Sequence, residues 1–187
     1  MRKRGRNLAI NYKSASRLLL QEAVSDEICF FISHKKEDKP SAIAISDYIN
    51  HAGFNTYIDL HDEELQRAVD EMNSKTITEC IEKGLVKSSH IICLISNATR
   101  KSWWVPFEIG YAKKAGARVL TLKLKGEFEL PEYLKISKMI LGTKGLNRYL
   151  EILLQKELLV EEVVKGGFTK IASMPRHPLD EHLDWNK

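Results

Sequence analysis

Runs of apolar residues, spaced along the middle of the chain, give the clearest indication of its fold. Residues 28–32 and 90–95 form two runs that are apolar at almost every position. Such runs are typical of strands that are covered on both faces, as in a parallel sheet. Shorter runs at 56–59, 119–122 and 139–141 have a similar character and predict three more strands.

Amphipathic stretches lie between these runs and predict helices that pack on the sheet. Residues 61–64 are expected to form a polar loop. Regular alternation of strands and helices predicts an α/β fold, a flavodoxin-like three-layer sandwich whose five-stranded parallel sheet carries helices on both faces. We expect helices from Pro40 to a stop at Gly53, from about Asn73 to Lys83 with a stop near Gly84, from the residues after Ser102 to Ala115 with a stop at Gly116, and from Leu146 to about Val164.

Both ends of the chain lie outside this alternating pattern. Residues 1–25 form a basic N-terminal extension, in which a short helix is expected at 14–24. Residues 26–165 are expected to form the domain itself, and 166–187 an irregular C-terminal tail. The end of this tail, at 179–185, is expected to form a short helix against the body of the protein.

Composition narrows the possible functions. The net charge is +4 over 187 residues, and part of the excess comes from the first six residues, so we expect no nucleic-acid partner. No stretch approaches the ~18 apolar residues of a membrane span, so we expect no membrane partner. Cys29 and Cys93 lie in apolar runs, which predicts reduced thiols in a cytoplasmic protein. His177 and His182 lie among acidic residues, but the irregular tail favours no metal site.

Polar residues follow three of the predicted strands, at the carboxyl ends where parallel α/β sheets bind their ligands. Ser33, His34 and Lys35 follow the first strand, Asp59 ends the second and Ser96 follows the third. The serine hydroxyls can donate to a sugar or a phosphate, and the lysine can meet a diphosphate as a point charge. Strand-end capping and a solvated charge explain the serines and the lysine equally well, and the aspartate also suits a turn.

The segment 102–112 combines large aromatic residues with a single carboxylate at the start of a predicted helix. Trp104 and Glu108 are four residues apart, which places them on one helix face. Pro106 fits the first turn, where its missing N–H group does no harm. The positive end of the helix favours an ionised Glu108, whereas aromatic neighbours oppose ionisation by desolvation, and the sequence leaves this balance open. An ordinary acid that complements the helix dipole would fit the same pattern.

Four segments together resemble Toll/interleukin-1 receptor (TIR) domains, in the order and spacing of that family. They are 28–36, 53–59, 92–96 and 102–109, and the resemblance covers roughly residues 26–155. The Trp-x-x-x-Glu element within the last segment is similar to the enzymatic bacterial and plant branch of the family. Members of that branch cleave the nicotinamide–ribose bond of NAD⁺.

The resemblance implies that NAD⁺ is the substrate, with no separate cofactor, and that Glu108 is the catalytic glutamate. Trp104 matches the aromatic residue that the family has four positions before this glutamate. Ser33, His34 and Lys35 match the loop after the first strand. His34 departs from the aromatic residue that the family often has at its position.

The chain is also similar to the signal-producing TIR proteins of Thoeris anti-phage systems. This similarity implies an NAD⁺ nucleosidase or ADP-ribosyl cyclase that self-associates and, after a phage-derived trigger, makes an ADP-ribose-derived signal for a separate effector protein. Two alternatives remain open. One is a non-enzymatic scaffold that associates through residues 61–65 and the adjacent helix. The other is an enzyme like the nucleoside deoxyribosyltransferases, which also use a glutamate at a ribose carbon.

Overall fold

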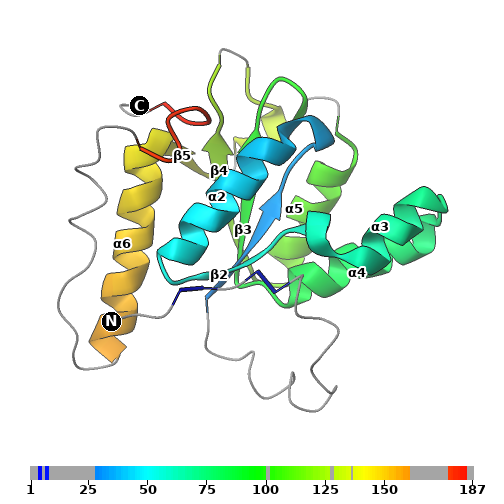
Figure 1. Cartoon of the computed structure of the whole chain (residues 1–187), viewed down its shortest axis with the longest axis horizontal. Coiled ribbons are helices and arrows are strands. Elements are labelled where there is room, and N and C mark those ends of the chain that lie inside the picture. The colour runs from blue at the N-terminus through cyan, green and yellow to red at the C-terminus, as the bar shows by residue number, and fades with distance from the viewer. Residues whose placement is uncertain are drawn as a thin grey trace.

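The computed structural model describes residues 4–5, 7–8, 28–99, 102–126, 129–135, 137–160 and 177–184. Within them, five strands form one sheet in the order β2-β1-β3-β4-β5, and every neighbouring pair is parallel (Figure 1). The predicted five-stranded parallel sheet is therefore confirmed. The strands are β1 (Cys29–Ser33), β2 (Asn55–Tyr57), β3 (His90–Ile95), β4 (Arg118–Lys123) and β5 (Lys138–Leu141).

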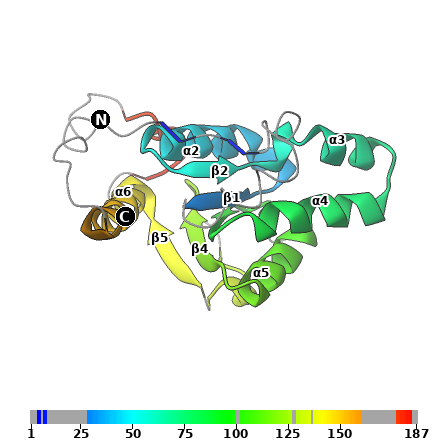
Figure 2. The same ribbon diagram turned by 90° about the horizontal axis from the view of Figure 1, so that it is seen from below.

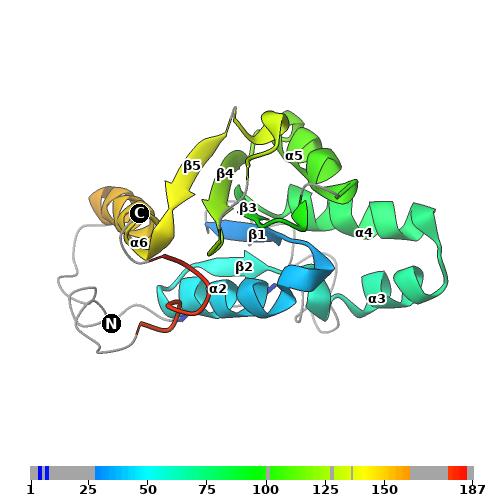
Figure 3. The ribbon, with the colours of Figure 1, turned by 90° about the horizontal axis from the view of Figure 1, so that it is seen from above.

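Helices cover both faces of this sheet, as predicted (Figure 2, Figure 3). α2 (Lys39–His51) and α6 (Gly142–Val160) lie on one face, and α4 (Ser74–Val86) and α5 (Trp104–Lys114) lie on the other. α3 (Glu63–Asp70) packs on α4, and this helix pair extends beyond the edge of the sheet. Short 3₁₀ helices lie in the connections, among them η2 (Lys36–Asp38), η3 (Asp59–His61) and η5 (Glu132–Leu134).

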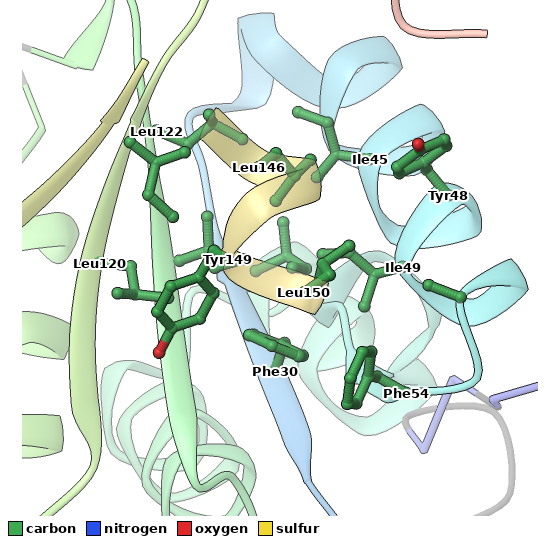
Figure 4. Close-up of a cluster of buried hydrophobic side chains, with 14 of the residues drawn as sticks. Phe30, Ile45, Tyr48, Ile49, Phe54, Leu120, Leu122, Leu146, Tyr149 and Leu150 are labelled. Atoms are coloured by element: carbon green, nitrogen blue, oxygen red, sulfur yellow. The ribbon is translucent and has the colours of Figure 1, made fainter. Parts of the chain in front are cut away.

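Each face of the sheet has its own core, because successive strand residues point to opposite sides. Phe30 and Ile32 of β1 pack with α2, α6 and the side chains of β3 and β4 (Figure 4). Cys29 and Phe31 pack in the second cluster, which contains side chains of α4 and α5. Ser33 shares the side of Cys29 and Phe31, so the last residue of β1 points toward the helix pair α4 and α5.

α3 contradicts the polar loop that was predicted at 61–64. The helix begins at Glu63, where the side chain of Asp62 accepts hydrogen bonds from the backbone N–H groups of Glu64 and Leu65, both at 3.1 Å. Leu65 and Ala68 are the buried residues of this helix. Two buried positions are too few to produce a clear apolar stripe, so the sequence pattern missed the helix.

Gly84 lies inside α4 and does not end it, contrary to the prediction. A Cβ atom at this position would lie 2.5 Å from Cε1 of Tyr57 and 3.0 Å from Cε2 of Phe31. The missing side chain therefore lets the helix approach the sheet closely. The predicted stops at Gly53 and Gly116 are confirmed, because these residues follow their helices with positive φ angles of 92° and 82°.

Two further boundaries differ from the prediction. α6 begins at Gly142 rather than at Leu146. The short helix predicted at 179–185 is wrong for its described part, because residues 178–182 form turns and residue 183 a bend. These turns nevertheless pack on the body, since Leu179 and Leu183 are buried in the core beneath α2 and α6.

The ends of the chain contain two predictions that fall outside the described residues. These are the helix at 14–24 and the end of α6 near residue 164. The described residues 7–8 lie along β2, where the backbone N–H group of Leu8 donates to the carbonyl of Thr56 at 2.6 Å. Among the helices that the structure describes, each is too short or too polar to cross a bilayer.

Candidate functional site

The candidate site lies where β1 and β3 end side by side. The chain leaves β1 toward α2 on one face of the sheet, and it leaves β3 toward α5 on the opposite face. This divergence is the topological switch point at which parallel α/β proteins bind their ligands. Ser33 is the last residue of β1, and α5 carries Glu108 to the same point.

Glu108 is buried, with only 6% of the residue exposed. The helix begins at Trp104, so Pro106 lies in its first turn as predicted and Glu108 follows in the second. The hydroxyl of Ser33 donates a hydrogen bond to Oε2 of Glu108. This bond ties α5 to the end of β1, and it gives the buried carboxyl a polar partner.

The balance that the sequence left open at Glu108 is decided by desolvation. Burial raises the pKa of the Glu108 carboxyl to about 8, from an ordinary value of 4.5. The hydrogen bond from Ser33 lowers this pKa and the nearby Asp59 raises it, but both effects are smaller than that of burial. The carboxyl is therefore mostly protonated at pH 7 in the described form of the protein.

Cys93 lies next to this pair and was assigned by the sequence only to the core. In the register of the sheet it is the β3 partner of Ser33, and its side chain is fully buried. Burial raises the pKa of the Cys93 thiol, and Glu108 raises it further. The thiol is thus neutral at pH 7, which favours a packing role. Its position could have been found from the strand parity that it shares with Ile91 and Ile95.

His34 and Asp59 form a second polar pair. His34 follows β1, whereas Asp59, which was predicted to end the second strand, instead begins η3, two residues after β2 ends at Tyr57. Nδ1 of His34 lies 3.6 Å from Oδ1 of Asp59 and 3.2 Å from the carbonyl oxygen of Ile32. Burial raises the pKa of the Asp59 carboxyl, and the neighbouring His34 opposes this shift. Oδ1 of Asp59 has no hydrogen-bond partner among the described residues. A hydroxyl or N–H group of a ligand could therefore donate a hydrogen bond to this oxygen.

Ser96 connects two loops at this edge of the sheet. Its hydroxyl donates to Oδ2 of Asp38 at 2.6 Å, and its Oγ accepts from the backbone N–H group of Ala98 at 3.1 Å. The loop after β3 is thereby tied to η2, which follows β1. Asp38 was not singled out by the sequence, where it is one of several charged residues in a polar loop. The serine therefore serves first to hold the loop that contains Lys35.

Lys35 and Trp104 are less enclosed than the residues described above. Lys35 is partly buried just before η2, and its carbonyl accepts from the backbone N–H group of Asp38 at 2.8 Å. Trp104 is 40% exposed, and its ring meets that of Phe107 edge-on, with centroids 5.8 Å apart. The Trp104 side chain lies near the surface, whereas Glu108, one turn further along, is buried.

The tail histidines bind hydroxyl groups of α2. Nε2 of His177 lies 3.1 Å from the hydroxyl of Tyr48, and Nδ1 of His182 lies 3.0 Å from that of Ser41. Within the described part of the chain, no group of three or more His, Cys, Asp or Glu residues is arranged to hold a metal ion.

The family of the protein follows from a comparison with known sequences. The family profile described as TIR domain matches residues 30–149, which is more than half of the chain. The chain belongs to the TIR domain family. A search of curated proteins found no match. The matched segment of this TIR domain runs from β1 into α6, so it contains Ser33, Glu108 and the other candidate residues.

Proposed function

We propose that this TIR domain cleaves the nicotinamide–ribose bond of NAD⁺, with the Glu108 carboxylate acting at the ribose. The observation that supports the proposal is the buried Glu108 carboxyl, which Ser33 holds at the switch point of the sheet. A carboxyl in this position is costly for stability, as its raised pKa indicates. Perturbed acids of this kind gather at functional sites.

One carboxylate is enough for this chemistry. Cleavage of an O-glycoside usually needs a second carboxyl that protonates the leaving oxygen. Nicotinamide instead leaves from a cationic pyridinium as a neutral molecule and needs no proton. The protein must supply negative charge near the oxocarbenium-like ribose, and an ionised Glu108 would do so. Water would then attack C1′ in hydrolysis, and a nucleophilic nitrogen would do so in cyclisation or base exchange.

The proposal requires the site to rearrange, because the Glu108 carboxyl in this structure is buried and mostly protonated at pH 7. A shift of α5 or of the loop after β1 would expose Glu108 and remove the desolvation that raises its pKa. Association of TIR domains through residues 61–65 and α3, or binding of a phage-derived trigger, would drive this shift by stabilising the open form. The described form is then a resting state.

The remaining candidate residues receive roles as substrate contacts in the open form. His34 and Asp59 would bind ribose hydroxyls, because Oδ1 of the aspartate lacks a described partner. Lys35 would meet the diphosphate, and Ser96 would keep its loop in place through Asp38. The partly exposed ring of Trp104 would stack on a base of the substrate.

We further propose that the product is an ADP-ribose-derived nucleotide that signals to a separate effector protein in cytoplasmic antiviral defence. The proposal rests on the resemblance of the sequence motifs to TIR proteins of anti-phage systems, and it goes beyond the family match. Lysate from phage-infected cells would supply the trigger in a test.

The deciding experiment follows nicotinamide release and identifies the co-product by mass spectrometry. Purified protein is incubated with NAD⁺, with lysate from infected cells and with lysate from uninfected cells. Release is expected with the first lysate, and Glu108→Gln should abolish it. The matched control is Glu151→Gln, which removes an exposed carboxylate of α6 and should leave release unchanged. No release under any of these conditions would overturn the proposal. If a parallel incubation shows cleavage of deoxynucleosides but none of NAD⁺, the protein would instead be a deoxyribosyltransferase.

A non-enzymatic scaffold is the second candidate function. It is favoured by two exposed apolar side chains, since Trp103 beside α5 is 92% exposed and Met72 beyond α3 is 86% exposed. Such side chains are suited to contacts with other TIR domains. A scaffold should keep its cellular activity after Glu108→Gln and lose it after Trp103→Ser, whereas the enzyme should lose its activity after the first change.

A further inference from the structure

A cavity of about 350 Å³ opens at the amino-terminal end of the strands, the end of the sheet that lies away from Glu108. Arg118 and Lys138, the first residues of β4 and β5, form part of its wall. α6 supplies Tyr149, Ile152 and Leu153. Because the strands are parallel, they all begin at this end of the sheet. The cavity is therefore separate from the candidate site, which lies at the carboxyl ends of the strands. We refer to it as the cationic cavity.

Two positive charges converge in the cationic cavity. Nζ of Lys138 lies over the ring of Tyr149, 4.9 Å from its centroid. The positive charge of Arg118 acts on the same side chain, because it opposes the rise in the Tyr149 pKa that burial causes. None of the described residues that line the cavity is acidic. Two cations beside one aromatic ring, with no carboxylate among the described lining residues, repel each other, and a bound anion would relieve this repulsion.

The rest of the wall is apolar. Leu120 and Leu153 are buried beneath the opening, and Tyr149 lies beside Leu120 (Figure 4). Ile152 is 37% exposed at the cavity, which leaves an aliphatic side chain partly open to solvent. A ligand with an apolar body would cover this surface and gain the corresponding hydrophobic free energy.

A buried imidazole adds an unused polar atom behind this wall. His90 is the β3 partner of Arg118, and its ring centroid lies 6.1 Å from that of Tyr149. Its Nδ1 lies 2.9 Å from the hydroxyl of Ser89, but its Nε2 has no hydrogen-bond partner among the described residues. Burial, helped by Arg118, lowers the pKa of His90 to about 4, so the ring is neutral at pH 7. A buried polar atom without a partner is costly, and a water molecule would satisfy it, because His90 itself does not line the cavity.

We propose that the cationic cavity binds a small organic anion, with its carboxylate or phosphate head between Arg118 and Lys138 and a short apolar body against Ile152 and Leu153. Charge-assisted hydrogen bonds hold the head, and the aliphatic wall selects the body. The volume lies at the lower end of the range of ~300–1,000 Å³ that is usual for ligand sites, which favours a single-ring compound over a dinucleotide. This binding does not depend on the reaction proposed for Glu108.

The test is a titration of the ¹⁵N-labelled full chain, followed by the backbone amide shifts of residues 118–120, 138 and 149–153. Phenyl phosphate and benzoate carry both the head and the body, inorganic phosphate carries the head alone, and benzyl alcohol carries the body alone. Saturable shifts are expected with the first two. We expect binding of inorganic phosphate and of benzyl alcohol to be at least about tenfold weaker, because each lacks one set of contacts.

Matched variants assign the contacts. Arg118→Gln and Lys138→Gln should each weaken phenyl phosphate about tenfold, the loss expected for one charge-assisted hydrogen bond. Arg118→Lys should retain part of the affinity. Lys113→Gln, which removes an exposed charge from α5, should leave the affinity for phenyl phosphate unchanged. The proposal is overturned if neither anion gives saturable shifts, if benzyl alcohol or inorganic phosphate binds as well as phenyl phosphate, or if the glutamine variants at positions 118 and 138 bind like the unaltered chain.

Discussion

The hydroxyl of Ser33 at the end of β1 donates to the carboxyl of Glu108 in α5, across 75 positions of the sequence. Through this contact, the strand that leads to one face of the sheet is joined to the helix that covers the other face. The ionisation of Glu108 therefore depends in part on Ser33, a residue of a different element. Substitution of either residue can test this contact.

Ser33→Ala should raise the pKa of Glu108 above its value of about 8, because the hydrogen bond from Ser33 favours the ionised carboxylate. The change should also lower the free energy of unfolding by about 1–2 kcal/mol, since the carboxyl loses its partner. The pKa can be measured by a ¹³C NMR titration of the glutamate side chains. Ser96→Ala, which removes a hydroxyl that bonds to Asp38, is the control. An unchanged pKa in the Ser33 variant would contradict the prediction.

The titration of Glu108 should make the free energy of unfolding fall as the pH rises from about 4.5 to about 8, whereas that of His90, with its lowered pKa of about 4, contributes the opposite slope up to about pH 6.5. Between its ordinary pKa of 4.5 and its folded value of about 8, Glu108 binds a proton in the folded state but not in the unfolded state. Folding therefore takes up a proton in this range, and each further pH unit costs up to about 1.4 kcal/mol. Urea unfolding at pH 5, 6, 7 and 8 measures the slope.

Glu108→Gln supplies the control for this pH dependence. The amide cannot ionise, so the variant should lose the part of the slope that comes from Glu108, and at pH 8 it should be more stable than the unaltered chain by roughly 4 kcal/mol. Equal slopes in the two proteins would show that the carboxyl is ionised in the folded state at neutral pH.

Gly84→Ala should lower stability even though alanine favours helices more than glycine does. The new Cβ would lie 2.5 Å from Cε1 of Tyr57, so α4 or the Tyr57 ring must move, at a cost of about 1–3 kcal/mol. Gly110→Ala in α5 is the matched control, because a Cβ there meets no atom within 4 Å. That change should stabilise the protein by up to about 1 kcal/mol. Thermal unfolding of both variants checks the prediction, and a stabilised Gly84 variant would refute it.

Asp38 and Ser96 should show a coupling free energy of about 1–2 kcal/mol in a double-mutant cycle to alanine, because their hydrogen bond involves a partly buried carboxylate. Urea unfolding of the two single variants and of the double variant provides the four values. Additive effects would mean that the bond between the two loops contributes nothing to stability. If NAD⁺ cleavage is found, each single change should also reduce it by displacing the loop of Lys35.

The strands and most helices could be predicted because the pattern of apolar residues that indicates each of them lies within one short segment of the sequence. β1 and β3 are apolar on both faces, and this pattern is visible in the sequence without knowledge of any partner. α3 was missed because its short buried face, with Leu65 and Ala68, produces little periodicity. Gly84 was misinterpreted as a helix end, since its role depends on the ring of Tyr57, which belongs to another element.

The candidate site was only partly predictable for the same reason. Its residues follow strand ends, a position that the sequence indicates directly. The protonation of Glu108 depends on how completely other segments cover it, and its contact with Ser33 depends on the neighbouring order of β1 and β3. Neither the extent of burial nor the pairing of distant strands can be read from the spacing of residues along one segment.

The folding unit is larger than the segment by which its family is identified. The family match ends at residue 149, but Leu150 and Leu153 of α6 and Leu179 and Leu183 of the tail complete the core beneath α2. Each buried leucine contributes about 2 kcal/mol of hydrophobic free energy. A protein shortened to residues 30–149 would therefore expose apolar side chains along α2, and it should aggregate during expression.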